Sequence, residues 1–71
     1  MRQDFLVTGM TCEHCVASVT EELSLIEGVQ HVDVVLAVGG ASTVSVVSSA
    51  PITVDAARQA IAEAGYELVS A

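Results

Sequence analysis

The chain has 71 residues, of which 52% are apolar. Its net charge is −7, and its basic residues of the arginine and lysine type are Arg2 and Arg58. This length allows one small domain, near the lower limit for an unaided core, and we expect residues 1–71 to form it. The acidic balance repels phosphate backbones and anionic lipid, so it excludes nucleic acid as an expected partner. No apolar stretch approaches the ~20 residues that a membrane span needs, so no membrane insertion is expected.

The N-terminus, Met-Arg-Gln-Asp-Phe, lacks the apolar segment of a secretory signal. We therefore expect a cytoplasmic protein, in a reducing compartment where paired cysteines are more often metal-binding or catalytic than structural. An initial Met1 and an end at Ala71 weakly favour a free-standing protein over a domain of a longer transporter.

The first half of the chain is predicted to form strand, helix and strand. Residues 5–8 are a short β-type run that ends at Gly9, and residues 29–36 alternate as a half-buried strand does. Between them a helix is predicted from about Glu13, with Gly28 at its C-terminal end. Its apolar stripe has a helical spacing of three, four and three residues: Val16, Val19, Leu23 and Ile26.

The second half repeats this order. A turn at Gly39 and Gly40 precedes the alternating residues 43–47, Pro51 breaks the chain, and residues 66–69 form a last predicted strand. A second helix ends near Gly65, and its stripe has the same spacing: Val54, Ala57, Ile61 and Ala64. The order β-α-β-β-α-β predicts an α+β, ferredoxin-like fold, a four-stranded antiparallel sheet with two helices on one face.

Alternation along the strands predicts which residues lie on the open face of the sheet. If Phe5, Val7, Val44 and Val46 face the helices, the opposite face carries four aliphatic side chains: Leu6, Val35, Val47 and Val69. They are a candidate self-association patch, although scattered exposed apolar residues are normal. We expect a monomer in the apo form, which sedimentation at high concentration tests.

The stretch GMTCEHC, from Gly9 to Cys15, contains both cysteines of the chain, Cys12 and Cys15. The topology places Cys12 in the loop after the first strand and Cys15 in the first turn of the first helix, with the hairpin at Gly39-Gly40 and Tyr66 at the same end of the sheet. A helix N-terminus favours thiolate over thiol, so we expect a lowered pKa for Cys15. Two thiolates without a further obligatory ligand suit a soft ion of low coordination number, for which Cu(I) is the biological candidate.

Two other uses of the cysteine pair remain open. A closed zinc site needs four ligands, and the histidines that remain are His14 and the distant His31. A thioredoxin-like redox site also places CxxC after a strand. Such sites usually carry an aromatic residue before the pair and Gly-Pro inside it, whereas Thr11 and Glu13-His14 stand here.

GMTCEHC resembles the GMTCxxC motif of the heavy-metal-associated domain family, which includes small bacterial copper chaperones and N-terminal domains of copper-transporting P-type ATPases. The similarity continues through Gly28-Val29, the alternation that ends at Leu36, and AIAEAGYEL from Ala60 to Leu68. It implies the same fold, with Cys12 and Cys15 binding Cu(I) and passing it by ligand exchange to the metal-binding domain of such an ATPase.

The resemblance leaves several points open. They are Zn(II) or Hg(II) as the cargo, a regulatory domain cut from an ATPase, and a metal-bridged dimer. Nothing else in the chain looks like a catalytic centre, so no enzymatic activity is expected.

Four residues around the cysteines are candidates for supporting roles. Met10 carries a thioether but is expected to pack inward, as the resemblance implies. Thr11 is expected to cap the first helix through its hydroxyl. His14 is expected to be exposed, with coordination as the alternative. Tyr66 either shields the metal and contacts the partner or is a core aromatic residue.

Overall fold

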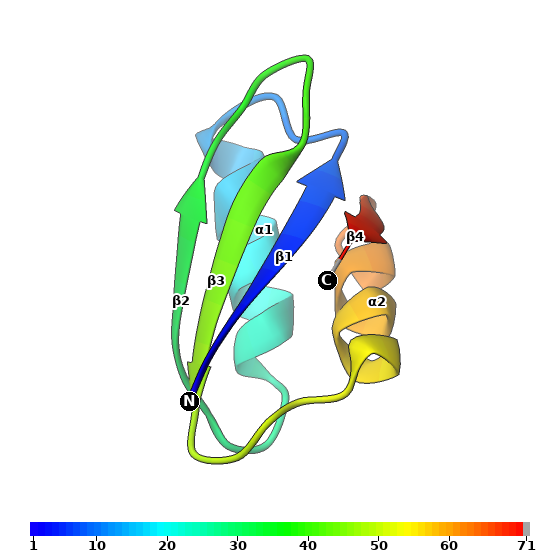
Figure 1. The fold of residues 1–71 in the computed structure, drawn as a ribbon. Helices are drawn as coiled ribbons and strands as arrows, with labels where there is room; N and C mark the ends of the chain where they lie inside the picture. The colour runs from blue at the N-terminus through cyan, green and yellow to red at the C-terminus, as the bar shows by residue number, and fades with distance from the viewer. Residues whose placement is uncertain (71) are drawn as a thin grey trace.

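The computed structural model describes residues 1–70, and Ala71 lies outside the described residues. The elements in chain order are β1 (Arg2–Thr8), α1 (Glu13–Ser24), β2 (Val29–Val35), β3 (Ser42–Ser48), α2 (Val54–Glu63) and β4 (Glu67–Ser70). The strands form one antiparallel sheet in the order β2-β3-β1-β4, and both helices cover one of its faces (Figure 1). The predicted ferredoxin-like fold is confirmed.

The core lies between the sheet and the helices. Its largest fully buried side chains include Phe5, Met10, Leu23 and Ile61. The alternation predicted for β1 and β3 holds, because the residues assigned to the helix side are buried and their strand neighbours are not. Within residues 1–70, no helix is long and apolar enough to cross a bilayer.

The start of α2 differs from the predicted apolar stripe. Thr53 is the N-cap and accepts a hydrogen bond from the Ala56 N–H at 3.0 Å, so Val54 is the first helical residue and is 40% exposed. The preceding Ile52 fills the core instead. Its backbone is held by Gln3 of β1, whose side-chain amide donates to the Ile52 carbonyl at 3.0 Å and accepts from the Ile52 N–H at 2.8 Å.

The two helices end differently, although both were expected to end at a glycine. Gly65 follows the α2 C-cap with φ +97°, and the N–H of Tyr66 donates to the carbonyl of Ile61 at 3.0 Å. This Schellman arrangement directs the chain into β4 and positions Tyr66. In contrast, α1 ends earlier, with Leu25 as its C-cap, so the prediction that Gly28 is its C-terminal glycine is wrong. The chain makes a further turn before β2 begins.

The open face of the sheet carries the four predicted aliphatic residues, all exposed or half-buried: Leu6, Val35, Val47 and Val69. The cross-strand neighbours of Leu6, Val35 and Val47 are polar. Thr43 lies between Leu6 and Val35 and pairs with both, and Val47 pairs with Arg2. The apolar surface on this face is therefore interrupted, and self-association through it stays a prediction.

Candidate metal-binding site

The loop between β1 and α1 presents both cysteines at one end of the sheet. Cys12 is the N-cap of α1, with extended backbone angles (φ −157°, ψ 176°), and Cys15 lies in the first turn. Gly9 has φ +96°, and a Cβ at this position would lie 3.4 Å from Cδ1 of Tyr66. A larger residue at Gly9 would therefore be strained, because L-residues rarely adopt this φ and the added Cβ would lie against the tyrosine ring.

The two sulfur atoms lie 3.7 Å apart and differ in their access to solvent. Cys12 is exposed, whereas Cys15 is 8% exposed, and both are free thiols. An ion about 2.3 Å from each sulfur, the distance typical of metal–thiolate bonds, fits this spacing in a bent arrangement. A straight two-coordinate arrangement requires the sulfurs to separate by roughly 1 Å. The exposed Cys12 side chain is the one with room to make that adjustment.

The surroundings of Cys15 lower its pKa from 9.0 to about 6. The largest cause is the backbone N–H of Thr11, which donates to Sγ at 3.5 Å, and the next is the side-chain hydroxyl of Tyr66. These donors stabilise the thiolate more than burial destabilises it. The predicted direction is confirmed, with a loop N–H rather than the helix terminus as the leading cause. In return, Cys15 raises the pKa of Tyr66.

Thr11 does not have its predicted capping role. The N-cap of α1 is Cys12, one residue later, and it makes no side-chain capping hydrogen bond. The hydroxyl of Thr11 instead lies 3.8 Å from Sγ of Cys15. The prediction is wrong because a strong capping residue marks a helix start only when its hydroxyl faces the helix N–H groups, and this loop directs the Thr11 donors at a sulfur.

The other site residues lie as follows. Met10 is 1% exposed and belongs to the core, in agreement with inward packing. His14 is exposed on α1, and Tyr66 is half-buried against the core cluster. Within residues 1–70, no three or more of the histidine, cysteine and acidic side chains lie together as a metal cluster.

The β2–β3 hairpin reaches the same end of the sheet, as predicted. A hollow of about 360 Å³ lies between the hairpin and the β1–α1 loop, lined by residues 8–11 on one side and 39–41 on the other. The Gly39-Gly40 signal predicts the hairpin, but no local sequence pattern indicates the apolar hollow between it and the β1–α1 loop.

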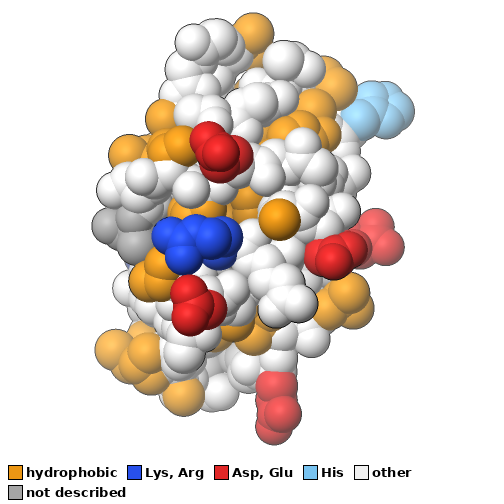
Figure 2. Space-filling view, turned by 90° about the vertical axis from the view of Figure 1, so that its right-hand side faces the viewer, with side chains coloured by type: hydrophobic (Ala, Val, Ile, Leu, Met, Phe, Trp, Pro, Cys, Tyr) orange, Lys and Arg blue, Asp and Glu red, His pale blue; other side chains and the backbone are white. Residues whose placement is uncertain are grey.

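Acidic groups dominate the charged surface. Figure 2 shows acidic side chains spread over the viewed face with apolar surface between them. Within residues 1–70, both arginines are engaged by neighbouring acids, Arg2 with Asp4 at 3.2 Å and Arg58 with Asp55 at 3.4 Å. Little positive charge is therefore available to an incoming partner.

A ferredoxin-like domain with a CxxC pair at the β1–α1 junction belongs to the class of small metal-handling domains. The chain is a member of the heavy-metal-associated domain family, whose profile matches residues 4–67. It is 41% identical to the COP-associated protein of Helicobacter felis over 68 residues, which cover 96% of this chain and 98% of that protein.

Two further proteins extend the comparison. The copper chaperone CopZ of Enterococcus hirae is 50% identical over 36 residues, about half of each chain. The solved structure of a CopZ metallochaperone superposes with a TM-score of 0.83 at 34% identity, covering 97% of this chain and all of that one. The chain is thus a copper-chaperone-like member of the family.

Proposed function

We propose that this chain is a cytoplasmic metallochaperone that carries Cu(I) on Cys12 and Cys15. It delivers the ion to the metal-binding domain of a copper-transporting P-type ATPase and has no enzymatic activity. The observation that carries the proposal is the sulfur pair itself: two free thiols 3.7 Å apart, one exposed and the other with a pKa near 6. Such a pair is anionic in part at neutral pH and suits a soft ion.

The transfer step is a ligand exchange. A thiolate of the partner adds to Cu(I) from the solvent side, where Cys12 is exposed, and the ion becomes briefly three-coordinate. One donor sulfur then leaves, a second partner thiolate adds, and the remaining donor sulfur leaves to complete the transfer. Cys15 remains a thiolate after release near pH 7, because Thr11 and Tyr66 stabilise that form without metal. No acid or base catalyst is required.

The neighbouring side chains support the pair in this proposal. Met10 anchors the β1–α1 loop, because its side chain is buried in the core. Thr11 and Tyr66 stabilise the Cys15 thiolate, and the tyrosine ring also covers one side of the loop. His14 lies exposed on α1, so we assign it no coordination.

The charge of the chain favours a basic partner face. With a net charge of −7, attraction to such a face raises the encounter rate, and added salt screens that attraction. Transfer is therefore expected to slow as salt rises. Transfer rates that do not respond to salt would show that the net charge does not contribute to docking.

The experiment that tests the proposal compares two rates under anaerobic conditions. Cu(I)-loaded protein is mixed with an ATPase metal-binding domain, and separately with a chelator present at a concentration that only scavenges free ion. We expect transfer to the domain to be much faster than dissociation into solution. Equal rates would mean release and recapture, and would overturn the ligand-exchange step. Preferential loading with Zn(II) or Hg(II) would mean that one of these ions, and not Cu(I), is the cargo.

A further inference from the structure

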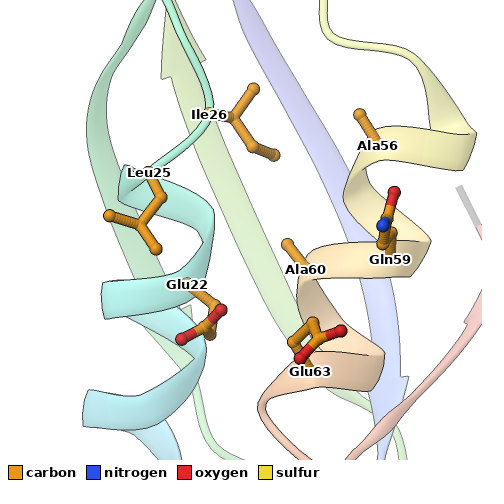
Figure 3. Close-up of a pocket in the computed structure, with 7 residues that line it drawn as sticks. All are labelled: Glu22, Leu25, Ile26, Ala56, Gln59, Ala60 and Glu63. Atoms are coloured by element: carbon orange, nitrogen blue, oxygen red, sulfur yellow. The ribbon is translucent and has the colours of Figure 1, made fainter.

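A groove runs between α1 and α2 on the helical side of the molecule. It has a volume of about 250 Å³ and is lined by residues from the end of α1, the turn after it and α2: Glu22, Leu25, Ile26, Ala56, Gln59, Ala60 and Glu63. Figure 3 shows these side chains along the gap between the two helices, with Glu22 and Glu63 on opposite sides. The proposed copper function uses none of them.

The groove is apolar along much of its length. Ile26 is half-buried against the core, and the methyl groups of Ala56 and Ala60 leave space for an incoming side chain. Leu25 stands at the edge with 75% of its surface exposed, the most exposed of the large apolar residues in the chain. A partner that seats an aliphatic side chain here removes apolar surface from water, which favours binding.

The groove is also acidic on both sides. Glu22 of α1 and Glu63 of α2 flank it, and within residues 1–70 neither takes part in an ion pair, since the two arginines are held by Asp4 and Asp55. Each carboxylate is free to accept from a lysine or arginine. The combination of an apolar centre and acidic walls matches a segment that carries basic residues on either side of an apolar stripe.

We propose that this groove binds a basic amphipathic helix of a partner protein. A helix fits because it can place apolar residues at spacings of three and four in a groove between two helices, with lysines or arginines beside them. A second copy of this chain is a poor occupant, because each copy carries a charge of −7 and its two arginines are already engaged.

The position of the groove leaves the cysteines accessible. Glu22 follows Cys15 by seven residues on α1, so it lies two turns and about 10 Å further along the same side of the helix. A helix bound around Glu22, Leu25 and Ala60 therefore need not cover the sulfurs. The inference does not rest on the copper function, and it holds for the metal-free protein.

The test is an NMR titration of the reduced apo protein with the peptide acetyl-KALKKALKKALK-amide, whose apolar residues recur at helical spacing. We expect amide shift changes at residues 22–26 and 56–63. The double variant Glu22→Gln/Glu63→Gln should weaken binding about five- to tenfold, because two exposed charge pairs are lost. The matched control Asp33→Asn/Glu67→Gln removes the same charge elsewhere and should change the affinity by less than about twofold.

Further variants and a second peptide distinguish binding in the groove from general electrostatic attraction to the acidic surface. Leu25→Ser should also weaken binding, and a peptide of the same composition without helical periodicity should bind less tightly. Equal losses in the groove and control variants, shifts spread over the acidic surface, or no binding would each overturn the proposal. If the amide shifts of the groove residues change with protein concentration in the absence of peptide, the groove is a self-association surface instead. A Cys12→Ser/Cys15→Ser protein should bind the peptide as the native protein does, so this result stands apart from the copper experiment.

Discussion

The backbone N–H of Thr11 donates to Sγ of Cys15 across 3.5 Å, from a residue four positions earlier in the chain. This contact ties the loop conformation to the ionisation of the buried sulfur. Because the donor belongs to the backbone, its position depends on how β1 leads into α1 and not on the side chain at position 11. The fold therefore favours the anionic form of this sulfur.

The ionisation of Cys15 can be followed directly through the chemical shift of its Cβ carbon. In the reduced apo protein we expect the pKa of Cys15 to be about 6. Tyr66→Phe should raise it, because the hydroxyl that stabilises the thiolate is lost while the ring and its packing remain. A native pKa near the ordinary value of 9.0, or no rise in the variant, would contradict this description of the site.

The same shift predicts how stability depends on pH. Between pH 6 and 9 the unfolded chain keeps the Cys15 proton and the folded chain does not, so folding releases a proton. The free energy of unfolding should therefore rise with pH across this window, and the contribution should be lost as pH falls through 6. Urea unfolding of reduced apo protein measures this rise. Cys15→Ser should flatten the slope and Cys12→Ser should keep it, so equal slopes in both variants would count against Cys15 as its source.

Met10 offers a test that separates packing from coordination. Met10→Ala should lower the free energy of unfolding by about 2–4 kcal/mol, because the side chain is buried in the core. Met10→Leu conserves the volume and should cost less than about 1.5 kcal/mol while leaving Cu(I) affinity unchanged. A large loss of Cu(I) affinity in a stable Met10→Leu protein would mean that the thioether binds the ion.

The paired hydrogen bonds between Gln3 and the backbone of Ile52 should contribute to stability. Gln3→Ala leaves the N–H and carbonyl of Ile52 without these partners, so we expect a loss of about 1–3 kcal/mol in the free energy of unfolding. Gln59→Ala is the matched control, because Gln59 is exposed and makes no such pair of hydrogen bonds among residues 1–70. This variant should change the free energy of unfolding by less than about 0.5 kcal/mol. Similar losses in both variants would show that the paired hydrogen bonds between Gln3 and Ile52 contribute little to stability.

The fold could be predicted from the sequence because its signals are local and repeated. Alternating valines such as Val44 and Val46 identify β3, and the helical spacing of Val19 and Leu23 identifies α1. The cysteine pair was equally visible, since two cysteines three residues apart stand at the start of a predicted helix. These features depend on neighbours within a few positions, which sequence patterns describe well.

The remaining features depend on contacts between distant residues or on the choice between adjacent ones. Gln3 meets Ile52 across 49 positions, and no local pattern indicates that pairing. The N-cap falls on Cys12 rather than Thr11 because the loop turns its donors toward Cys15, which hydroxyl preference does not reveal. Likewise, α1 ends at Ser24, and turn hydrogen bonds from Ile26 to Leu23 and from Val29 to Ile26 lead the chain into β2.

Whether Cys12 and Cys15 bind Cu(I) is decided by an anaerobic competition titration of the reduced protein with Cu(I) against a chromogenic chelator, repeated with Zn(II). We expect one tightly bound Cu(I) per chain and zinc binding weaker by orders of magnitude. Tight Cu(I) binding should disappear in Cys12→Ser and in Cys15→Ser and should change little in His14→Ala. Tight Cu(I) binding that survives Cys15→Ser, or zinc bound as tightly as copper, would contradict this expectation.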